Sequence, residues 1–209
     1  KIRSGASPEV SFGMSKLGIL ILFLFTFTLG VNAQPDYTTE GKVFTSLKEA
    51  SLQPDSVFRL KLRRKNYKEI PPEILKFKNL RELDLISNNI KRIPSDIGKL
   101  EKLEILRLER NQIDVVGKEI GNLPNLKYLD LGKNRIQALP YEIGNLSSLE
   151  FLQIWGNEIT LIPESIQKLE KLKYLDMRAI LLTESEKEDV LEQLPNTEVL
   201  LSPGCNCGK

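Results

Sequence analysis

The amino-acid sequence predicts an α/β solenoid, in which short parallel strands stack coil upon coil. Two observations favour this fold class: a motif that recurs every 23 residues, and within each copy two apolar residues, in most copies leucines, that stand two positions apart. Residues two apart point to the same side of a strand, so each copy supplies one short strand with an apolar side. One such strand cannot bury that side alone, whereas stacked copies can.

The repeat is in register over five copies and is preceded by one divergent copy. The five begin at Leu80, Leu103, Leu126, Leu149 and Leu172, and the divergent one begins at Val57. The copies at Leu80, Leu103 and Leu126 follow the pattern L-x-x-L-x-L-x-x-N-x-I in full, and the other copies follow it in part. The first residue of the pattern is numbered position one. Positions four and six are expected to point inward, as for Leu83 with Leu85, and the alternate positions to face outward.

An asparagine follows the strand in four copies, at Asn88, Asn111, Asn134 and Asn157. The backbone loses its sheet partners where the chain turns inward, and an asparagine side chain can both donate to it and accept from it. We therefore expect these side-chain amides to hydrogen-bond the backbone N–H and C=O groups of the turn.

The return half of most copies carries an apolar residue followed by proline, at Ile70-Pro71, Ile93-Pro94, Leu139-Pro140 and Ile162-Pro163. Proline opposes a continuous helix, so an extended or tightly turned path is expected. Val116-Gly117 breaks the pairing. Gly98, Gly121 and Gly144 suit a bend with little room.

Both ends of the stack need a cover. Residues Val43 to Leu52 predict a short amphipathic helix before the first coil. At the other end Ile180 replaces the asparagine, and the string from Thr183 to Glu186 predicts a capped, longer helix. A final strand near Thr197 to Ser202 is expected to close the stack.

This pattern resembles the leucine-rich-repeat family over about residues 57–202, in the 23-residue subtype of exported proteins of pathogenic bacteria such as spirochaetes. The resemblance implies a curved horseshoe segment with a short-stranded parallel sheet on its concave face. It also implies that this face binds proteins or peptides, although a fold by itself does not establish a function.

Outward residues at equivalent positions should form columns across the coils. Two columns are charged, with signs that mostly alternate: Arg81, Glu104, Lys127, Glu150 and Lys173 at position two, and Lys61, Asp84, Arg107, Asp130, Gln153 and Asp176 at position five. One interpretation is that neighbouring charges in a column neutralise each other, which is worth about 0 to 1 kcal/mol for each exposed pair. The other is that the charges recognise a binding partner.

The third column, Arg59, Glu82, Ile105, Tyr128, Phe151 and Tyr174, turns from charged to apolar, and Trp155 shares its face. Large apolar groups on a solvent face favour an interaction site, although stacking that only stabilises the ladder is an alternative. The partner-binding hypothesis comprises Ile105, Tyr128, Phe151, Trp155 and Tyr174, with a charged or polar rim of Arg107, Asp130, Gln153 and Arg178.

The flanking segments indicate export. Residues 1–13 have no assigned role, and residues 14–33 are typical of a signal peptide cleaved after Ala33. The apolar run from Leu17 to Leu29 is shorter than a membrane span needs. Residues 34–56 would be the N-terminal capping segment, residues 57–202 the solenoid, and residues 203–209 a tail with Cys205 and Cys207. An internal disulfide, a disulfide to a partner and an incidental tail all fit that tail.

The composition argues against an enzyme. The chain contains no histidine, which removes the most frequent general base and the commonest metal ligand. No cofactor or metal site is predicted, and the nearly neutral mature chain disfavours nucleic acid as a partner. The expected function is an exported module that binds an extracellular or surface protein. The alternative is a self-associating structural protein of the cell envelope, joined through the repeat face or the tail cysteines.

Overall fold

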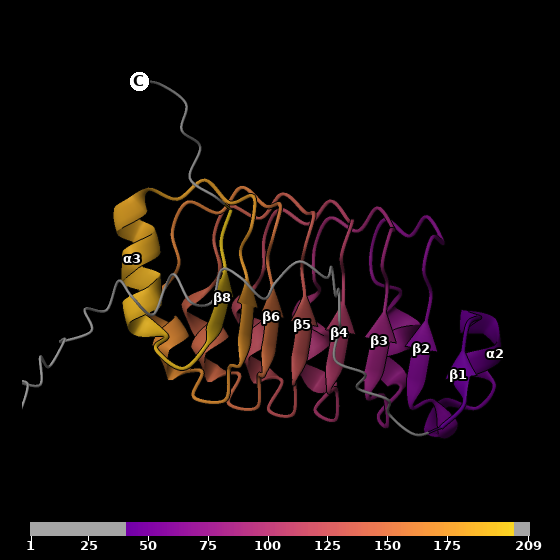
Figure 1. Ribbon diagram of the computed structural model, residues 1–209. Coiled ribbons are helices and arrows are strands. Elements are labelled where there is room, and N and C mark those ends of the chain that lie inside the picture. Colours follow the sequence, from indigo (N-terminus) through magenta and orange to yellow (C-terminus); the bar gives the residue numbers. More distant parts are fainter. Residues whose placement is uncertain (1–40, 203–209) are drawn as a thin grey trace, which may run out of the picture. The chain divides into compact units, whose positions relative to one another are not determined.

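The computed structural model describes residues 41–202 as one solenoid with a single open sheet. The sheet has eight parallel strands in sequence order, from β1 to β8, so each coil lies between the coils that precede and follow it in the chain. Figure 1 shows these strands side by side, with a helix near each end of the stack. The expected α/β solenoid is confirmed.

Six of the strands carry the repeat: β2 (Arg59–Lys61), β3 (Glu82–Asp84), β4 (Ile105–Arg107), β5 (Tyr128–Asp130), β6 (Phe151–Gln153) and β7 (Tyr174–Asp176). Their register follows the sequence repeat, since Leu83 pairs with Leu106 and Leu106 with Leu129. The columns read from the sequence are therefore real rows of neighbouring side chains.

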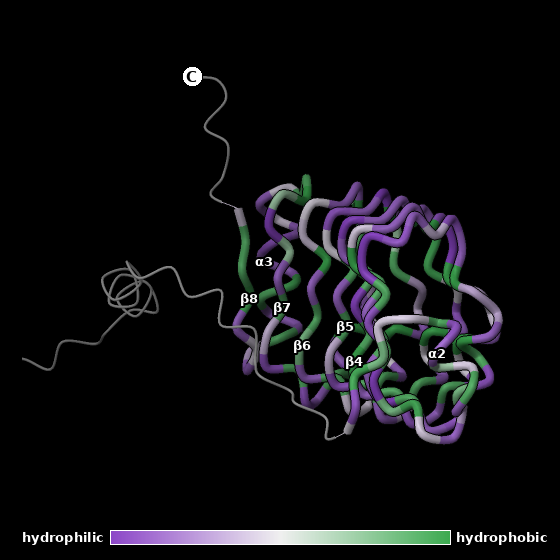
Figure 2. The backbone as a smooth tube through the Cα atoms, turned by 90° about the vertical axis from the view of Figure 1, so that its right-hand side faces the viewer, coloured by the Kyte–Doolittle hydropathy of each residue, from purple (hydrophilic) through white to green (hydrophobic). Residues whose placement is uncertain are grey.

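The leucines of positions four and six form the core, as expected. Leu83, Leu85, Leu106 and Leu108 are fully buried, together with the equivalent residues of the other coils. The hydropathy colours in Figure 2 alternate along the coils between apolar and polar segments. A continuous apolar core thus runs along the whole stack.

The asparagines make the bonds that the sequence predicts. Asn134 Oδ1 accepts from the backbone N–H of Ile113 at 3.0 Å, and its amide donates to the carbonyls of Leu108 and Leu131 at 3.1 and 2.9 Å. Asn88, Asn111 and Asn157 repeat this arrangement in their own coils. Each asparagine therefore joins its own coil to the preceding one.

The residue before each asparagine position has a left-handed backbone. This set comprises Arg64, Ser87, Arg110, Lys133, Gly156 and Ala179, with φ between 51° and 65°. Only Gly156 adopts this conformation without the steric cost of a side chain. The sequence pattern did not indicate this recurrent turn, because its occupants share no residue type.

The return segments form short 3-10 helices: η3 (Pro72–Lys76), η4 (Ser95–Lys99), η5 (Lys118–Asn122), η6 (Tyr141–Asn145) and η7 (Glu164–Lys168). The expected prolines cap four of them, and Gly117 caps η5 with a similar backbone, φ −71° and ψ 157°. A Cβ on Gly144 would collide with the carbonyl oxygen of Ser165, so the close approach expected at these glycines is confirmed.

The caps match the sequence in part. Helix α2 covers only Leu47–Ser51, because Val43–Phe44 forms strand β1, which pairs with β2. The prediction of a helix from Val43 was wrong at these two residues, where backbone pairing to the open sheet edge prevails. The 3-10 helix η2 (Pro54–Ser56) follows α2 in the chain. Helix α3 (Glu184–Gln193) has the expected capping box, and β8 (Glu198–Leu200) closes the sheet.

The predicted signal peptide, the segment before it and the cysteine tail lie outside the described residues. Their predicted boundaries, 1–13, 14–33 and 203–209, stay predictions. Between residues 41 and 202 no helix is long and apolar enough to cross a membrane.

Candidate functional site

The candidate site is the outward side of the sheet, here called the concave face. It carries positions two, three, five and seven of each coil. The position-two column pairs along its length, since Glu104 bonds Lys127 at 2.8 Å and lies 3.7 Å from Arg81, while Lys173 bonds Glu150 at 2.6 Å. These half-exposed pairs fit the expected neutralisation.

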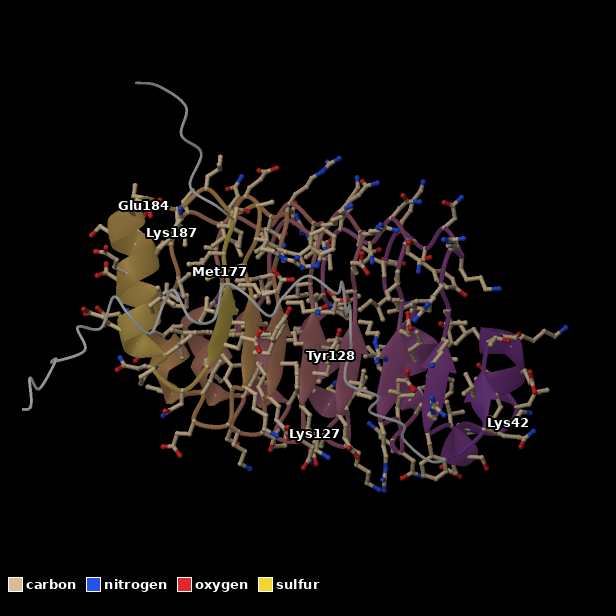
Figure 3. All side chains as sticks on the ribbon, viewed as in Figure 1. Lys42, Lys127, Tyr128, Met177, Glu184 and Lys187 are labelled. Carbon is tan, nitrogen blue, oxygen red and sulfur yellow. The ribbon has the colours of Figure 1, made fainter. Side chains whose placement is uncertain are left out.

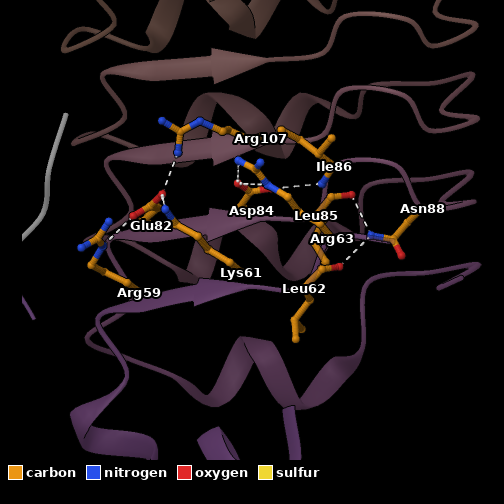
Figure 4. A network of polar contacts seen from close by, with 10 residues as sticks. All are labelled: Arg59, Lys61, Leu62, Arg63, Glu82, Asp84, Leu85, Ile86, Asn88 and Arg107. Atoms are coloured by element: carbon orange, nitrogen blue, oxygen red, sulfur yellow. Dashed lines mark hydrogen bonds and ion pairs between the residues drawn. The ribbon is translucent and has the colours of Figure 1, made fainter. Parts of the chain in front are cut away.

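The N-terminal half of the face centres on one buried carboxylate, Glu82, which is 1% exposed. Its oxygens accept from Arg59 Nε at 2.7 Å and Arg107 Nη1 at 2.7 Å, and Lys61 Nζ lies 3.1 Å away (Figure 4). Burial alone would raise the pKa of Glu82, but the hydrogen bonds from Arg59 and Lys61 and the charge of Arg107 lower it below its usual value.

This cluster corrects the charge pattern expected from the sequence. Asp84, Arg107, Asp130 and Asp176 are each at most 7% exposed, so four of the six position-five residues are buried rather than part of a solvated surface row. Pairing also runs between columns, because Arg107 bonds Glu82 of position three and not the aspartates of its own column. Long basic side chains reach diagonal neighbours, which a reading of one column at a time misses.

Two aspartates of position five bond to an arginine of position seven. Arg63 donates to Asp84 Oδ2 through Nε at 2.7 Å and Nη2 at 2.5 Å, and Arg178 donates to both carboxylate oxygens of Asp176 at 2.6 and 2.9 Å. The sequence analysis missed the role of Arg63. Its position-seven register, shared with Arg178, is the signal that could have revealed it.

The apolar column is only partly exposed. Ile105 and Tyr128 are 0% exposed, so the expectation that they form a solvent-facing patch was wrong. Neighbouring side chains contribute to this burial: the Arg107 guanidinium lies 5.0 Å from the Tyr128 ring centroid, and the Phe151 ring 6.2 Å. The Tyr128 hydroxyl donates to Gln153 at 2.9 Å. Figure 3 labels Tyr128 on the sheet and Lys127 toward one edge.

The half-exposed part of the column lies in the C-terminal half. The Phe151 and Tyr174 rings stand 6.1 Å apart on adjacent strands, and both are of intermediate exposure. Trp155 and Gln153 have the same intermediate exposure, and Arg178 is exposed. Of the nine predicted partner-binding residues, these five therefore reach the surface of the concave face.

The indole of Trp155 lies directly on Gly132 of the preceding coil. A Cβ at Gly132 would collide with the indole Nε1, so only glycine leaves room for the ring in this position. Lys133 Nζ stands 4.9 Å from the centre of the indole. Gly132 and Trp155 are therefore in a direct contact that fixes the indole.

Within residues 41–202 no group of three or more acidic or cysteine side chains is arranged to hold a metal ion. The chemistry that the face offers is recognition by flat aromatic rings and by fixed charges. No cofactor is required for either.

Comparison with known proteins decides the family. A model of the leucine rich repeat matches residues 56–113, and a model of the leucine-rich repeat region matches residues 111–201. The chain belongs to the leucine-rich-repeat family. Proteins with this fold are generally binding scaffolds without enzymatic activity, and they commonly mediate protein–protein binding.

Solved leucine-rich-repeat structures resemble the chain closely in fold. A leucine-rich-repeat protein of Leptospira interrogans is 29% identical with a TM-score of 0.62, and the match covers 79% of this chain and 53% of that one. The chain thus spans about half the length of the Leptospira protein. The plant peptide hormone receptor RGFR1, solved in complex with RGF2, is 28% identical with a TM-score of 0.59, covering 78% and 26%.

Internalin C2 of Listeria monocytogenes has a TM-score of 0.63 and 24% identity over 76% of this chain and 66% of its own, which shows the shared fold alone. No curated protein matches the chain significantly.

Proposed function

We propose that this leucine-rich-repeat protein is an exported module that binds an extracellular or surface protein through the C-terminal half of its concave face. The observation that carries the proposal is the group of half-exposed aromatic side chains Phe151, Trp155 and Tyr174 on adjacent coils. Tryptophan and tyrosine dominate the energetics of protein interfaces, because they bury a large area at a small entropic cost.

The surroundings of the aromatic group support a protein ligand. Gln153 and Arg178 border the rings and supply hydrogen-bonding groups for a polar rim. The plant peptide hormone receptor RGFR1, whose fold this chain shares, was solved in complex with RGF2. A protein or peptide laid across the strands would cover all three rings together.

The test compares aromatic residues from the two sides of the solenoid. A ligand is first selected from purified extracellular proteins, and its affinity is then measured for Trp155→Ala and Tyr141→Ala. Tyr141 is a matched control, because it is an aromatic residue that is 57% exposed on η6, on the return side. Trp155→Ala should weaken binding by about 2 kcal/mol, and Tyr141→Ala by less than about 0.5 kcal/mol. The reverse order would refute the concave-face assignment.

Export is tested separately. The proposal expects cleavage between Ala33 and Gln34, since small residues precede that bond. N-terminal sequencing of the protein from the culture medium or envelope should begin at Gln34. A protein that begins at Met14 and sediments with membranes would contradict a cleaved signal.

Self-association is the second candidate, because Val115 and Leu161, at equivalent positions two coils apart, are 60% and 66% exposed. It predicts a doubled mass in solution without any added partner. Mass measurement with and without reductant also separates a dimer held by the tail cysteines from one held by apolar contacts. A monomer under both conditions removes this candidate.

A further inference from the structure

Asp130 differs from the other two position-five aspartates in its hydrogen-bond partners. Asp84, Asp130 and Asp176 each accept the backbone N–H two residues ahead through Oδ1, at 3.2, 3.0 and 3.2 Å. Asp84 and Asp176 also bond an arginine through Oδ2. Asp130 is fully buried, and its Oδ2 has no hydrogen-bond partner.

The sequence explains why no arginine reaches Asp130. The residue that corresponds to Arg178 in its coil is Gly132, and the residue that corresponds to Arg63 in the preceding coil is Glu109, an acid. Arg107, which pairs with Asp130 in the strand register, already bonds Glu82 at 2.7 Å. Glu109 itself pairs with Arg110 at 3.3 Å.

The charges around Asp130 do not compensate for its burial. Burial raises the pKa of Asp130 to about 7; the Gly132 N–H and Arg107 lower it, and the acidic side chains Glu109 and Asp84 raise it. A buried carboxylate is stable as an anion only when a cation or several donors accompany it. Above neutral pH, Asp130 therefore carries a buried negative charge that the Gly132 N–H and Arg107 offset only in part.

Trp155 lies against Gly132, the residue whose N–H bonds this carboxylate. Its indole occupies the space where a side chain of residue 132 would begin, and Gly132 donates its N–H to Asp130. The Lys133 ammonium stands 4.9 Å from the centre of the ring, so the indole already takes part in one cation–π contact. A guanidinium group both stacks on an indole and pairs with a carboxylate, because it is planar and carries several N–H donors.

We propose that Asp130 and Trp155 form a receptor site for an arginine side chain of the protein partner. The incoming guanidinium donates to Asp130 Oδ2 and stacks on the indole, and so takes the place that Arg63 and Arg178 occupy at the equivalent aspartates. This inference rests on the proposed function and adds the chemistry of one contact. Because Asp130 is buried in the unbound protein, the indole must shift from Gly132 as the arginine enters.

That shift provides the measurement, because Trp155 is the only tryptophan in the chain. Its fluorescence in the full chain is titrated with the acetylated, amidated peptide Gly-Arg-Gly, and with the same peptide carrying citrulline or lysine in place of arginine. Citrulline keeps the shape of arginine and lacks the charge. At about pH 8.5 we expect a saturable change with the arginine peptide, and binding about tenfold weaker with citrulline.

The variants locate the effect. Asp130→Asn should weaken binding of the arginine peptide by about tenfold, whereas Asp176→Asn, whose aspartate already bonds Arg178, should leave it unchanged. Affinity should also fall by about tenfold between about pH 8.5 and pH 5.5, since Asp130 takes up a proton over that range. Thermal unfolding of both variants confirms that the fold is intact.

Several results would overturn the site. These are equal binding of the arginine and citrulline peptides, an affinity unaffected by Asp130→Asn, or no saturable change up to about 50 mM peptide, a concentration that would detect even a single weak contact. Tighter binding of the lysine peptide would replace the guanidinium with an ammonium as the ligand and so contradict the proposal as stated.

The outcome is separable from that of the proposed function. A partner whose binding needs Trp155 but tolerates Asp130→Asn would keep the protein-binding function and remove the arginine site. If the protein binds the arginine peptide but Trp155→Ala does not weaken binding of the natural partner, the arginine site would be kept and the proposed protein-binding function of this face would be removed.

Discussion

Arg107 Nη1 donates to Glu82 Oε1 at 2.7 Å, and this bond joins two adjacent strands across the buried, charged half of the concave face. Glu82→Gln keeps the shape of the side chain but leaves Arg59, Lys61 and Arg107 without their shared anion. Removing one partner of a buried pair typically costs about 3 to 5 kcal/mol. We expect a loss of that order in urea unfolding, and less than about 1 kcal/mol for Glu104→Gln, which is more exposed. Similar small losses for both variants would contradict the importance of burial.

Glu82 also gives a pH dependence with a definite sign. Its folded-state pKa is lowered, so its contribution to stability is present above the unfolded value of 4.5 and is lost as the pH falls through the folded value. The free-energy difference between the wild type and Glu82→Gln should therefore shrink at acid pH.

Asp130 should show the opposite dependence. Its pKa in the folded protein is about 7, above the ordinary 3.8, so the folded state binds the proton more tightly than the unfolded state. The resulting stability is fully present below the unfolded value and is lost as the pH rises through about 7. Asp130→Asn should thus be more stable than the wild type by about 1 to 3 kcal/mol at alkaline pH, and the gain should vanish by about pH 4. A pH-independent difference would indicate that Asp130 does not titrate in this range.

The asparagine ladder is tested at Asn134. Asn134→Ala removes the acceptor for the Ile113 N–H and the donor to the Leu108 and Leu131 carbonyls, all of which are buried. Each unsatisfied buried group costs about 1 to 3 kcal/mol, so the variant should lose at least about 2 kcal/mol in chemical denaturation. Asn125→Ala is the matched control, because Asn125 makes one exposed bond to the Glu101 carbonyl. Its loss should stay below about 0.5 kcal/mol.

The inward register is tested at Leu129 and Leu152, which are both fully buried on adjacent strands. Truncation of either to alanine should cost about 2 to 5 kcal/mol, since it removes apolar contacts and leaves a cavity. Equilibrium unfolding in urea measures the loss. A cost below about 1 kcal/mol at both sites would show that these leucines do not form the core.

The contact of Gly132 with the indole is tested by Gly132→Ala. The new Cβ would collide with Trp155 Nε1, so the ring must move toward solvent and its fluorescence emission should shift to longer wavelength. Gly156→Ala is the comparison, because its Cβ would meet Lys133 at an ordinary 3.5 Å while its φ of 65° imposes strain. It should lose about 1 kcal/mol of stability without that spectral shift. An unchanged spectrum in Gly132→Ala would contradict the contact.

The sequence predicted the fold well because residues one repeat length apart become partners in neighbouring strands. Leu83, Leu106 and Leu129 stand 23 residues apart and pair as neighbours, so periodicity alone placed the strands and the asparagines. The strand at Val43–Phe44 was missed, since two residues carry too little pattern to separate a strand from the start of a helix.

The site was harder to predict, because column positions say which side chains face outward but not how far each is covered. Tyr128 and Ile105 share the outward side with Phe151, yet they are buried, and their lateral neighbours help to decide this. The missing cation at Asp130 depends on two residues of different coils, Glu109 and Gly132, which only a comparison of all copies at positions five and seven brings together.

The asparagine bonds also determine how such a chain can change its length. Asn88, Asn111 and Asn134 make the same bonds to the preceding coil, so all the joints between these coils are interchangeable. Excision of residues 103–125 would rejoin the coil of Leu80 to that of Leu126 through an ordinary joint. The concave face would not be preserved, because Glu82 would then adjoin Tyr128 without Arg107, and Asp84 would adjoin Asp130. Coil number can therefore vary freely in this architecture, whereas the order of the coils is tied to the balance of charge on the face.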